Sequence, residues 1–339
     1  MKKIVFGGAA LAAGLFGVVQ PVLAEATQYP LTLTNCGEVV TFEKAPGRAV
    51  TIGQNSTEIL MWLGLSEKIV GTAVWFGKVP PEFEAANAGI PRLADNDPSF
   101  ESVIARQPEL VAAQFEWHVG PNGAVAKRAQ FHDLGIPSYV SPADCTAKDN
   151  SVGGDGVRVE MFTMDLIYQE ITELAAIFDV QDRGAELVRE LKAREAAAKA
   201  KVAGAAQDIT MAFWFSSPEV KGEAYIGGKN GAPAYIMETL GARNVIETQE
   251  EWPLVSWETI AGKNPAVLVL GEMDRRRYGA DDVNVKIDFL RTDPVARELD
   301  AVKQQHWVVL PAQSMSTTIR TIDGIEMLAD AIQRFGLVN

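Results

Sequence analysis

The 339-residue chain has only two cysteines and three histidines, too few for a scaffold built on several zinc ions. It also lacks a surplus of basic residues, because 31 Lys and Arg face 44 Asp and Glu, a net charge of −13. Without a Lys/Arg surplus to displace phosphate counterions, we expect no nucleic-acid partner. Apolar residues are not scarce: they make up 47% of the chain, enough for a large core, which excludes general disorder.

Sequence motifs of common catalytic and nucleotide-binding sites are absent as well. There is no HExxH, no GxSxG, no GxxxxGK[ST] and no GxGxxG after a strand. Asp95-Asn96-Asp97 resembles part of a calcium loop but lacks the glycine and the bidentate glutamate, so we interpret it as a turn. We therefore expect a protein that is not an enzyme, with no cofactor and no metal ion held directly by its side chains.

The first 24 residues have the pattern of a cleaved secretory signal. Lys2 and Lys3 precede an apolar run over 4–19, and small residues at 22–24 form a cleavage site. The run is short of the ~20 residues of a spanning helix. A buried N-terminal helix and a retained anchor are the alternatives. No cysteine follows Ala24, so we expect no lipid anchor, and the mature chain of 339 − 24 = 315 residues lies outside the cytoplasm.

Cys36 and Cys145 are candidates for one disulfide, since that compartment is oxidising. The bond would close a loop of 145 − 36 = 109 residues, worth about 4–5 kcal/mol in the chain-entropy account. Two buried free thiols are the alternative. Neither cysteine belongs to a CxxC pair, which argues against a redox function.

Strand and helix patterns alternate in two separate stretches of the mature chain. Short apolar strands are predicted at 49–52, 69–74, 110–113 and 138–140, and again at 209–215, 267–270 and 307–310, with helices between them. Repeated β-α-β units of this kind predict mostly parallel sheets covered by helices. We expect an α/β protein with an N-terminal lobe over 25–154 and a C-terminal lobe over 179–339.

The segment between the two stretches does not continue this alternation of strands and helices. Apolar residues recur every three or four positions from Val157 to Phe178, which predicts one helix over 155–178, about 36 Å long. This helix would connect the two lobes. A second helix over 183–203, rich in Ala, Glu, Lys and Arg, is interpreted as a solvated surface element.

Aromatic and charged residues gather where the predicted strands end. Ligands of open α/β sheets bind beyond the carboxyl ends of the strands. Aromatic rings with polar tips suit a bulky, partly apolar ligand, and neighbouring guanidinium groups suit an anionic one. Core packing of each ring and a solvated loop for the arginines are the alternatives. The candidate ligand-binding residues are Trp75, Trp117, His118, Trp214, Tyr225, Trp252, Arg275, Arg276 and Tyr278.

Several short motifs in a fixed order resemble one family from about residue 36 onward. The motifs are APGRAVTI (45–52), STEIL with LGL (56–65), IVG (69–71), SFESVI with QPELV (99–111), the GIP turn (135–137), METLGARN (237–244), VSWE (255–258) and NPAVLVL (264–270). In this order and spacing the chain is similar to the substrate-binding proteins of ABC importers for ferric siderophores, haem and cobalamin. The resemblance implies two α/β lobes joined by a rigid helix, the class III architecture.

The resemblance also implies a function and its residues. The protein would be a periplasmic monomer that captures a ferric siderophore or similar iron chelate between its lobes and delivers it to an ABC permease with its ATPase. In this family one glutamate on each lobe docks onto arginines of the permease. The motifs place them at Glu101 and Glu238, with ordinary surface glutamates as the alternative.

Other cargoes and other functions stay open at this point. Haem is one alternative, with His118 or Tyr225 as axial ligand, and cobalamin, whose corrin ring tryptophans could stack on, is another. The arginines favour an anionic iron complex. An extracytoplasmic enzyme and a binding protein that feeds a sensor are the remaining alternatives. The rigid connecting helix predicts a small movement of the lobes on binding.

Overall fold

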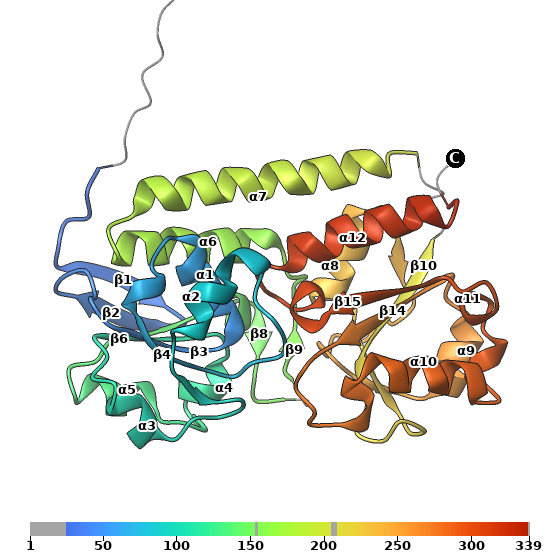
Figure 1. The fold of residues 1–339 in the computed structure, drawn as a ribbon, viewed down its shortest axis with the longest axis horizontal. Coiled ribbons are helices and arrows are strands. Elements are labelled where there is room, and N and C mark those ends of the chain that lie inside the picture. Colours follow the sequence, from blue (N-terminus) through green and yellow to red (C-terminus); the bar gives the residue numbers. More distant parts are fainter. Residues whose placement is uncertain (1–24, 153–154, 205–208, 338–339) are drawn as a thin grey trace, which may run out of the picture.

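Two α/β lobes lie side by side in the computed structural model, which describes residues 25–152, 155–204 and 209–337 (Figure 1). The predicted signal segment over 1–24 lies outside the described residues. Each lobe is built on its own sheet, and the two sheets fall on either side of the predicted connecting segment. Within the described ranges, no helix combines the length and the apolar character needed to cross a bilayer.

The N-terminal lobe carries a five-stranded sheet in the order β5-β4-β3-β6-β7, with all its pairings parallel. Every residue of the central strands β3 and β6 is buried, as expected for a sheet covered on both faces. Its strands are β3 (Ala49–Ile52), β4 (Ile69–Ala73), β5 (Arg92–Ala94), β6 (Leu110–Ala113) and β7 (Ser138–Val140), and its helices are α1 (Gln54–Trp62), α2 (Glu84–Ala88), α3 (Phe100–Ile104), α4 (Glu116–Val119) and α5 (Arg128–His132).

The C-terminal lobe carries a mixed sheet in the order β13-β11-β10-β14-β15, with β12 also pairing with β10. Strands β10, β12, β14 and β15 are parallel, whereas β11 pairs antiparallel with both of its neighbours, β10 and β13. Its strands are β10 (Thr210–Ser216), β11 (Ala224–Ile226), β12 (Arg243–Asn244), β13 (Leu254–Val255), β14 (Val267–Glu272) and β15 (Trp307–Pro311), and its helices are α8 (Ala232–Thr239), α9 (Trp257–Lys263), α10 (Val283–Thr292), α11 (Asp300–Lys303) and α12 (Thr321–Arg334).

The connecting segment differs from its prediction. Helix α6 begins only at Met164 and ends at Ile177, so it has 14 residues instead of the 24 expected over 155–178. Upstream, Val157–Arg158 forms strand β9, which pairs with β8 (Lys148–Asp149), and the Phe162 amide donates to the carbonyl of Asn230. Apolar residues keep a helical spacing through residues 157–163, but the backbone there is extended because it pairs with other segments of the chain.

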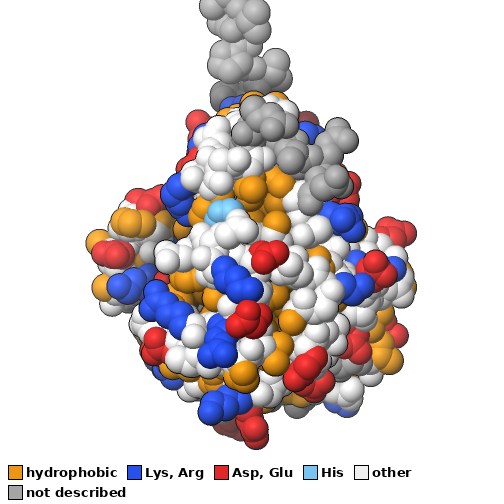
Figure 2. Space-filling model, turned by 90° about the vertical axis from the view of Figure 1, so that its right-hand side faces the viewer, with side chains coloured by type: hydrophobic (Ala, Val, Ile, Leu, Met, Phe, Trp, Pro, Cys, Tyr) orange, Lys and Arg blue, Asp and Glu red, His pale blue; other side chains and the backbone are white. Residues whose placement is uncertain are grey.

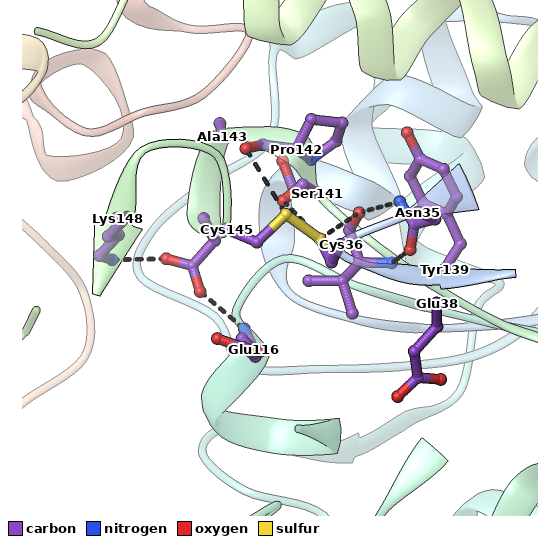
Figure 3. Close-up of a disulfide and its surroundings, with 12 residues drawn as sticks. Asn35, Cys36, Glu38, Glu116, Tyr139, Ser141, Pro142, Ala143, Cys145 and Lys148 are labelled. Carbon is purple, nitrogen blue, oxygen red and sulfur yellow. Dashed lines mark hydrogen bonds and ion pairs between the residues drawn. A yellow bond between two sulfur atoms is a disulfide. The ribbon is translucent and has the colours of Figure 1, made fainter. Parts of the chain in front are cut away.

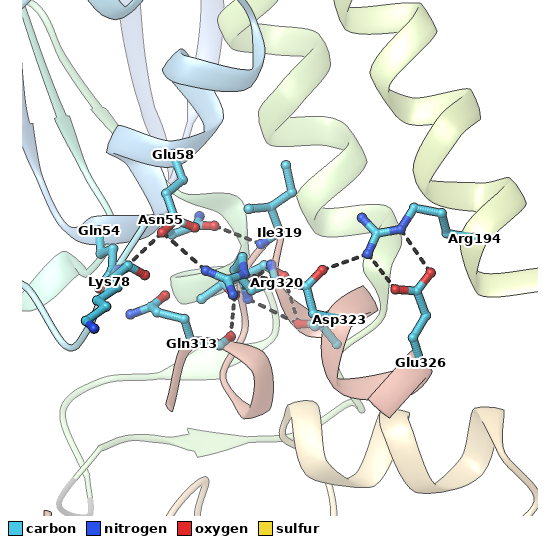
Figure 4. A network of polar contacts seen from close by, with 12 residues as sticks. Gln54, Asn55, Glu58, Lys78, Arg194, Gln313, Ile319, Arg320, Asp323 and Glu326 are labelled. Carbon is cyan, nitrogen blue, oxygen red and sulfur yellow. Dashed lines mark hydrogen bonds and ion pairs between the residues drawn. The ribbon is translucent and has the colours of Figure 1, made fainter. Parts of the chain in front are cut away.

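Helix α7 (Gln181–Lys201), interpreted from sequence as a solvated surface element, is the long helix that spans both lobes (Figure 1). Near its start the Arg183 Nε donates to the carbonyl of Trp62 in the N-terminal lobe, at 2.9 Å. Further along, Arg194 pairs with Asp323 at 2.7 Å and with Glu326 at 2.6 Å, both on α12 (Figure 4). Its charged residues therefore help to hold the two lobes in a fixed relation.

A buried polar contact joins the lobes close to the first strand-to-helix turn (Figure 4). The turn needs Gly53, whose φ is 137°, because a Cβ there would lie 2.2 Å from the Cβ of Gln114. Directly after it, the Asn55 Oδ1 accepts the Ile319 amide of the C-terminal lobe at 2.8 Å. The Asn55 Nδ2 donates to Glu170 of α6 at 3.2 Å, so one side chain connects both lobes and the helix between them.

The predicted disulfide between Cys36 and Cys145 is present, with 5.6 Å between the Cα atoms (Figure 3). Cys36 lies in the turn between β1 (Leu31–Asn35) and β2 (Glu38–Phe42), and Cys145 follows β7. Beside it, Asn35 exchanges two hydrogen bonds of 2.8 Å with the backbone of Val140. The bond thus ties the N-terminal hairpin to the edge of the first sheet.

Candidate functional site

A cavity of about 1370 Å³ lies between the two lobes, at the carboxyl ends of the strands of both sheets. Sites for drug-sized ligands usually occupy about 300–1,000 Å³, so this one has room for a larger molecule. Its walls are the segments after β4, β6, β10 and β14, together with the turn at 95–97 and the residues that follow β15.

Eight of the nine candidate ligand-binding residues line this cavity. From the N-terminal lobe these are Trp75, Trp117 and His118, and from the C-terminal lobe Tyr225, Trp252, Arg275, Arg276 and Tyr278. Trp117 is 62% exposed, whereas Trp75 is only 3% exposed. Phe76, Phe115 and Phe215 add further aromatic surface.

Trp214 does not line the cavity, which corrects the prediction made for it. Its side chain is fully buried among the helices of the C-terminal lobe, with ring centroids 4.7 Å from Trp257 and 5.7 Å from Phe289. Its Nε1 donates to the carbonyl of Ser216 at 3.0 Å. Successive side chains of a strand point to opposite faces, and the next residue, Phe215, is the one that lines the cavity.

The arginine loop, residues 273–278 after β14, reaches across the cleft to the other lobe. The amides of Asp274 and Arg275 both donate to the Phe76 carbonyl, at 2.7 and 3.2 Å. The Arg275 guanidinium also lies 4.2 Å from the centroid of the Phe76 ring. Burial lowers the pKa of Arg275 from its ordinary value, and the Nε has no hydrogen-bond partner. A half-buried guanidinium that lines the cavity is suited to a ligand oxygen.

Acidic groups of the N-terminal lobe face this loop. The hydrogen bond to His118 is the main reason why the pKa of Asp97 lies below its usual range, and Arg277 and Arg275 of the opposite lobe lower that pKa further. The His118 Nε2 lies 3.0 Å from the Asp97 Oδ1, and its buried Nδ1 has no partner. His118 is only 3% exposed, so the imidazole is less open to a ligand than its position in the sequence indicates.

A buried cluster of charges closes the floor of the cleft. Lys148 lies 2.6 Å from Asp144 and 3.2 Å from Glu251, and Arg158 lies 3.0 Å from the same Glu251. Burial opposes the charge on Lys148, yet the carboxylates of Asp144 and Glu251 hold its pKa above the ordinary value. These contacts join β8 and β9 to the loop before β13, so the floor also connects the lobes.

Two tyrosines form part of the wall on the C-terminal lobe. The rings of Tyr225 and Tyr278 lie 6.2 Å apart, and the Arg277 guanidinium lies 5.5 Å from the Tyr278 ring. Burial is the main reason why the pKa of Tyr225 is raised, and Tyr278 adds to it. Next to them Trp252 packs on Phe215 at 4.9 Å. This wall offers flat apolar faces with hydroxyl and guanidinium groups at their edges.

The predicted docking residues, Glu101 and Glu238, are both exposed, but they occupy different settings. Glu101 lies in the first turn of α3, whose N-cap Ser99 accepts the Ser102 amide at 3.2 Å, whereas Glu238 lies near the end of α8. Glu258 has the setting of Glu101: it is exposed in the first turn of α9, and the N-cap Ser256 accepts the Thr259 amide at 3.2 Å.

Sequence reasoning missed Glu258, although a repeated pattern was available to find it. Ser99-Phe100-Glu101 precedes Pro108 and the buried strand β6, and Ser256-Trp257-Glu258 precedes Pro265 and the buried strand β14. The offset is the same for both features, since 256 − 99 and 265 − 108 both equal 157. Helix α9 belongs to the end of the molecule seen in Figure 2, where acidic and basic side chains are interspersed.

Among the described residues, no group of three or more His, Cys, Asp or Glu side chains is placed to hold a metal ion. The acidic turn at 95–97, interpreted from sequence as structural, belongs to the cavity wall instead. Its place beside the arginine loop follows from the packing of the two lobes, which no local pattern encodes.

Comparison with known proteins covers nearly the whole chain. Residues 50–314 match the family described as Periplasmic binding protein. The chain is also similar to an uncharacterized ABC transporter substrate-binding lipoprotein, YvrC, of Bacillus subtilis (strain 168). The two are 23% identical over 308 residues, which is 90% of this chain and 86% of the relative.

Solved structures share the fold. An ABC-type Fe3+-hydroxamate transport system from Saccharomonospora viridis DSM 43017 is 28% identical, with a TM-score of 0.70 over 90% of this chain and 99% of that chain. The periplasmic heme-binding protein RhuT from Roseiflexus sp. RS-1 is 19% identical, with a TM-score of 0.65 over 85% of this chain and 98% of that chain. At 19% identity the likeness concerns the fold alone.

Proposed function

The chain belongs to the periplasmic binding protein family, whose members are solute-binding proteins and not enzymes, and from this premise we propose that its cargo is an anionic iron chelate. The observation that carries the proposal is the cavity between the lobes, where an aromatic wall meets the arginine loop. The likeness to the Fe3+-hydroxamate transport system supports the choice of an iron complex. The chelator holds the iron, and the protein holds the chelator.

Three features of the cleft support this choice of ligand. The volume of about 1370 Å³ suits a chelate larger than a drug-sized molecule. Flat rings from both lobes can cover the apolar parts of the chelator. Arg275 has an unfilled donor beside the cavity, and Arg277 follows on the same loop, so guanidinium groups can pair with carboxylate or hydroxamate oxygens.

Haem is the second candidate, and the two tyrosines of the cavity, Tyr225 and Tyr278, favour it. Tyr225 lines the cavity with Arg277 nearby, and a tyrosine can serve as axial ligand of haem iron. His118 is the weaker of the two axial candidates, because its Nε2 contacts Asp97. A Soret band that survives His118→Ala and is lost in Tyr225→Phe would move the assignment to haem.

Delivery requires an ABC permease and its ATPase as partners, and we propose Glu101 and Glu258 as the docking pair, in place of Glu101 and Glu238. Both residues are exposed, and each follows a capping serine at the start of a surface helix, one on each lobe. We further propose that the leader is cleaved after Ala24, that no lipid is attached, and that the mature protein is a periplasmic monomer.

A fluorescence titration of the mature protein tests the identity of the cargo. Tryptophan fluorescence is followed against ferric siderophores, ferric citrate, haem and cobalamin, and the cleft tryptophans Trp117 and Trp252 are expected to be quenched by the bound chromophore. Saturable quenching at sub-micromolar concentration by one anionic ferric chelate supports the proposal. Saturable quenching by haem or cobalamin alone, or by none of them, would overturn the cargo assignment.

A further inference from the structure

The shape of the arginine loop is set by a carboxylate buried beneath it. Asp281 is 1% exposed, and its Oδ2 accepts the amides of Arg277 at 2.7 Å and Tyr278 at 2.9 Å. Its Oδ1 accepts the hydroxyl of Ser216, the last residue of β10, at 2.5 Å. One side chain therefore connects the loop to the end of a central strand. Three hydrogen bonds to one buried side chain fix the loop relative to this strand.

A buried lysine lies close enough to this carboxylate for their charges to interact. Lys286 of α10 is fully buried, and its Nζ donates to the carbonyl of Phe215 at 2.6 Å and to that of Gly271. Phe215 and Gly271 lie near the ends of β10 and β14, so Lys286 holds together the two strands from which the cleft wall extends. Burial lowers the pKa of Lys286 to about 7, and Asp281 is the carboxylate that most opposes this fall.

We infer that Asp281 is the positioning residue of the ligand site: it folds the arginine loop so that its guanidinium groups face an anionic ligand, and it thereby sets the charge preference of the cleft. This inference rests on the proposed function. Without the carboxylate, the amides of Arg277 and Tyr278 lose their acceptor. Two backbone hydrogen bonds remain beneath the loop, from the Met273 amide to the Asp281 carbonyl and from the Asp281 amide to the Tyr278 carbonyl, but neither satisfies the amides of Arg277 and Tyr278. The contact with Phe76 holds only the loop residues 274 and 275.

Asp281→Ala is the direct test, because it removes both acceptor oxygens beneath the loop. Asp288→Ala is the matched control, since Asp288 is exposed on α10, the helix that follows Asp281. Binding is measured for two probes of opposite charge: ferric citrate, an anionic complex, and ferrioxamine B, a ferric trihydroxamate with a free ammonium group. We expect Asp281→Ala to lower the affinity for ferric citrate about tenfold relative to the affinity for ferrioxamine B, and Asp288→Ala to leave this ratio of affinities unchanged.

The ratio of the two affinities distinguishes a loss of loop positioning from a general loss of structure. A purely structural defect would weaken both probes equally and leave the ratio at its wild-type value, which would overturn the inference. If Asp281→Ala does not fold, Ser216→Ala removes a single hydrogen bond to the same carboxylate, and a change of about threefold in the same direction is expected. An unchanged ratio in Ser216→Ala would then count against the inference.

Amide hydrogen exchange distinguishes this inference from the proposed function. Without any ligand, Asp281→Ala should lose protection at the amides of Arg277 and Tyr278, while Asp288→Ala keeps it. Retained protection in Asp281→Ala overturns the positioning role. If the wild-type protein binds neither probe nor any other chelate tested, the proposed function is wrong. The hydrogen exchange at these two amides does not affect that conclusion.

Discussion

At the residue scale, the contact between the lobes contains buried carboxyl groups whose charge is costly. Glu170 accepts hydrogen bonds from Ser141 at 2.5 Å and Asn55 at 3.2 Å, but its second oxygen has no partner. Burial raises the pKa of Glu170 to about 7. Glu58 has the same value for the same main reason, although Arg320 lies 3.6 Å away (Figure 4). Both groups keep their protons to a higher pH in the folded protein than in the unfolded chain.

A raised carboxyl pKa predicts that stability falls as pH rises toward neutrality. Between the ordinary value of 4.5 and about 7, the folded state binds more protons than the unfolded state, so the free energy of unfolding decreases with pH. For Glu170 alone the full difference is about 3 kcal/mol. Urea unfolding of Glu170→Gln should show a smaller decrease between pH 5 and pH 7 than the wild type. The exposed Glu160→Gln is the control, and an equal decrease in both variants would contradict this account.

The tryptophans divide into core and cleft residues, and their replacement should separate stability from binding. Trp214→Ala removes a fully buried ring that contacts Trp257 and Phe289, at an expected cost of about 3–5 kcal/mol in the free energy of unfolding. Trp117→Ala, at a position 62% exposed on the cleft rim, should leave stability within about 0.5 kcal/mol. Thermal and urea unfolding of both variants check this, and comparable losses would contradict the placement of Trp214 in the core.

At the element scale, two short helices with the same beginning mark the proposed docking sites. Helices α3 and α9 each start with a capping serine, an aromatic residue and an exposed glutamate. The helix dipole favours negative groups in the first turn, and both carboxylates are exposed to a partner's arginines. Glu238 near the end of α8 lacks this setting.

Charge reversal at these positions tests the docking pair. Glu101→Lys and Glu258→Lys should each lower uptake of the iron chelate at least tenfold while binding of the chelate in solution stays at the wild-type level. Glu238→Lys is the matched control and should transport normally. Normal uptake by Glu258→Lys together with loss in Glu238→Lys would restore the pair predicted from sequence.

The helices and strands also show which structural features local sequence patterns can predict and which they cannot. The strands at 49–52 and 110–113 were predictable because each is a short, mostly apolar run bounded by turn residues. The helix over 155–178 was wrong over its first third, since pairing of β9 with β8 overrides a helical spacing of apolar residues. Eight of the nine candidate residues line the cavity, as expected from strand ends that share one edge, whereas the burial of Trp214 depends on the direction of its side chain.

At the scale of the whole molecule, the contacts between the lobes resist a large opening. Helix α7, the Asn55 contact, the floor around Glu251 and the Phe76 contact with the arginine loop all join the two lobes. No pattern within one lobe could predict these contacts, because each pairs residues far apart in the chain. A molecule held at several separate places moves little as its ligand binds.

Small-angle scattering with and without the ferric chelate checks this rigidity. The radius of gyration should change by less than about 1 Å when the cleft is filled. The alternative of a flexible hinge predicts a clear compaction, which would show that the contacts between the lobes form only around the ligand.

The central claim is that one iron chelate is held in the cleft between the lobes. The most direct measurement is anomalous diffraction at the iron edge from crystals of the protein with the chelate that binds it most tightly. The account predicts a single iron peak inside the cavity, between the arginine loop with Tyr278 on one side and Phe115 with Trp117 on the other. An iron peak on the outer surface of either lobe, with the cleft empty at saturating chelate, would contradict it.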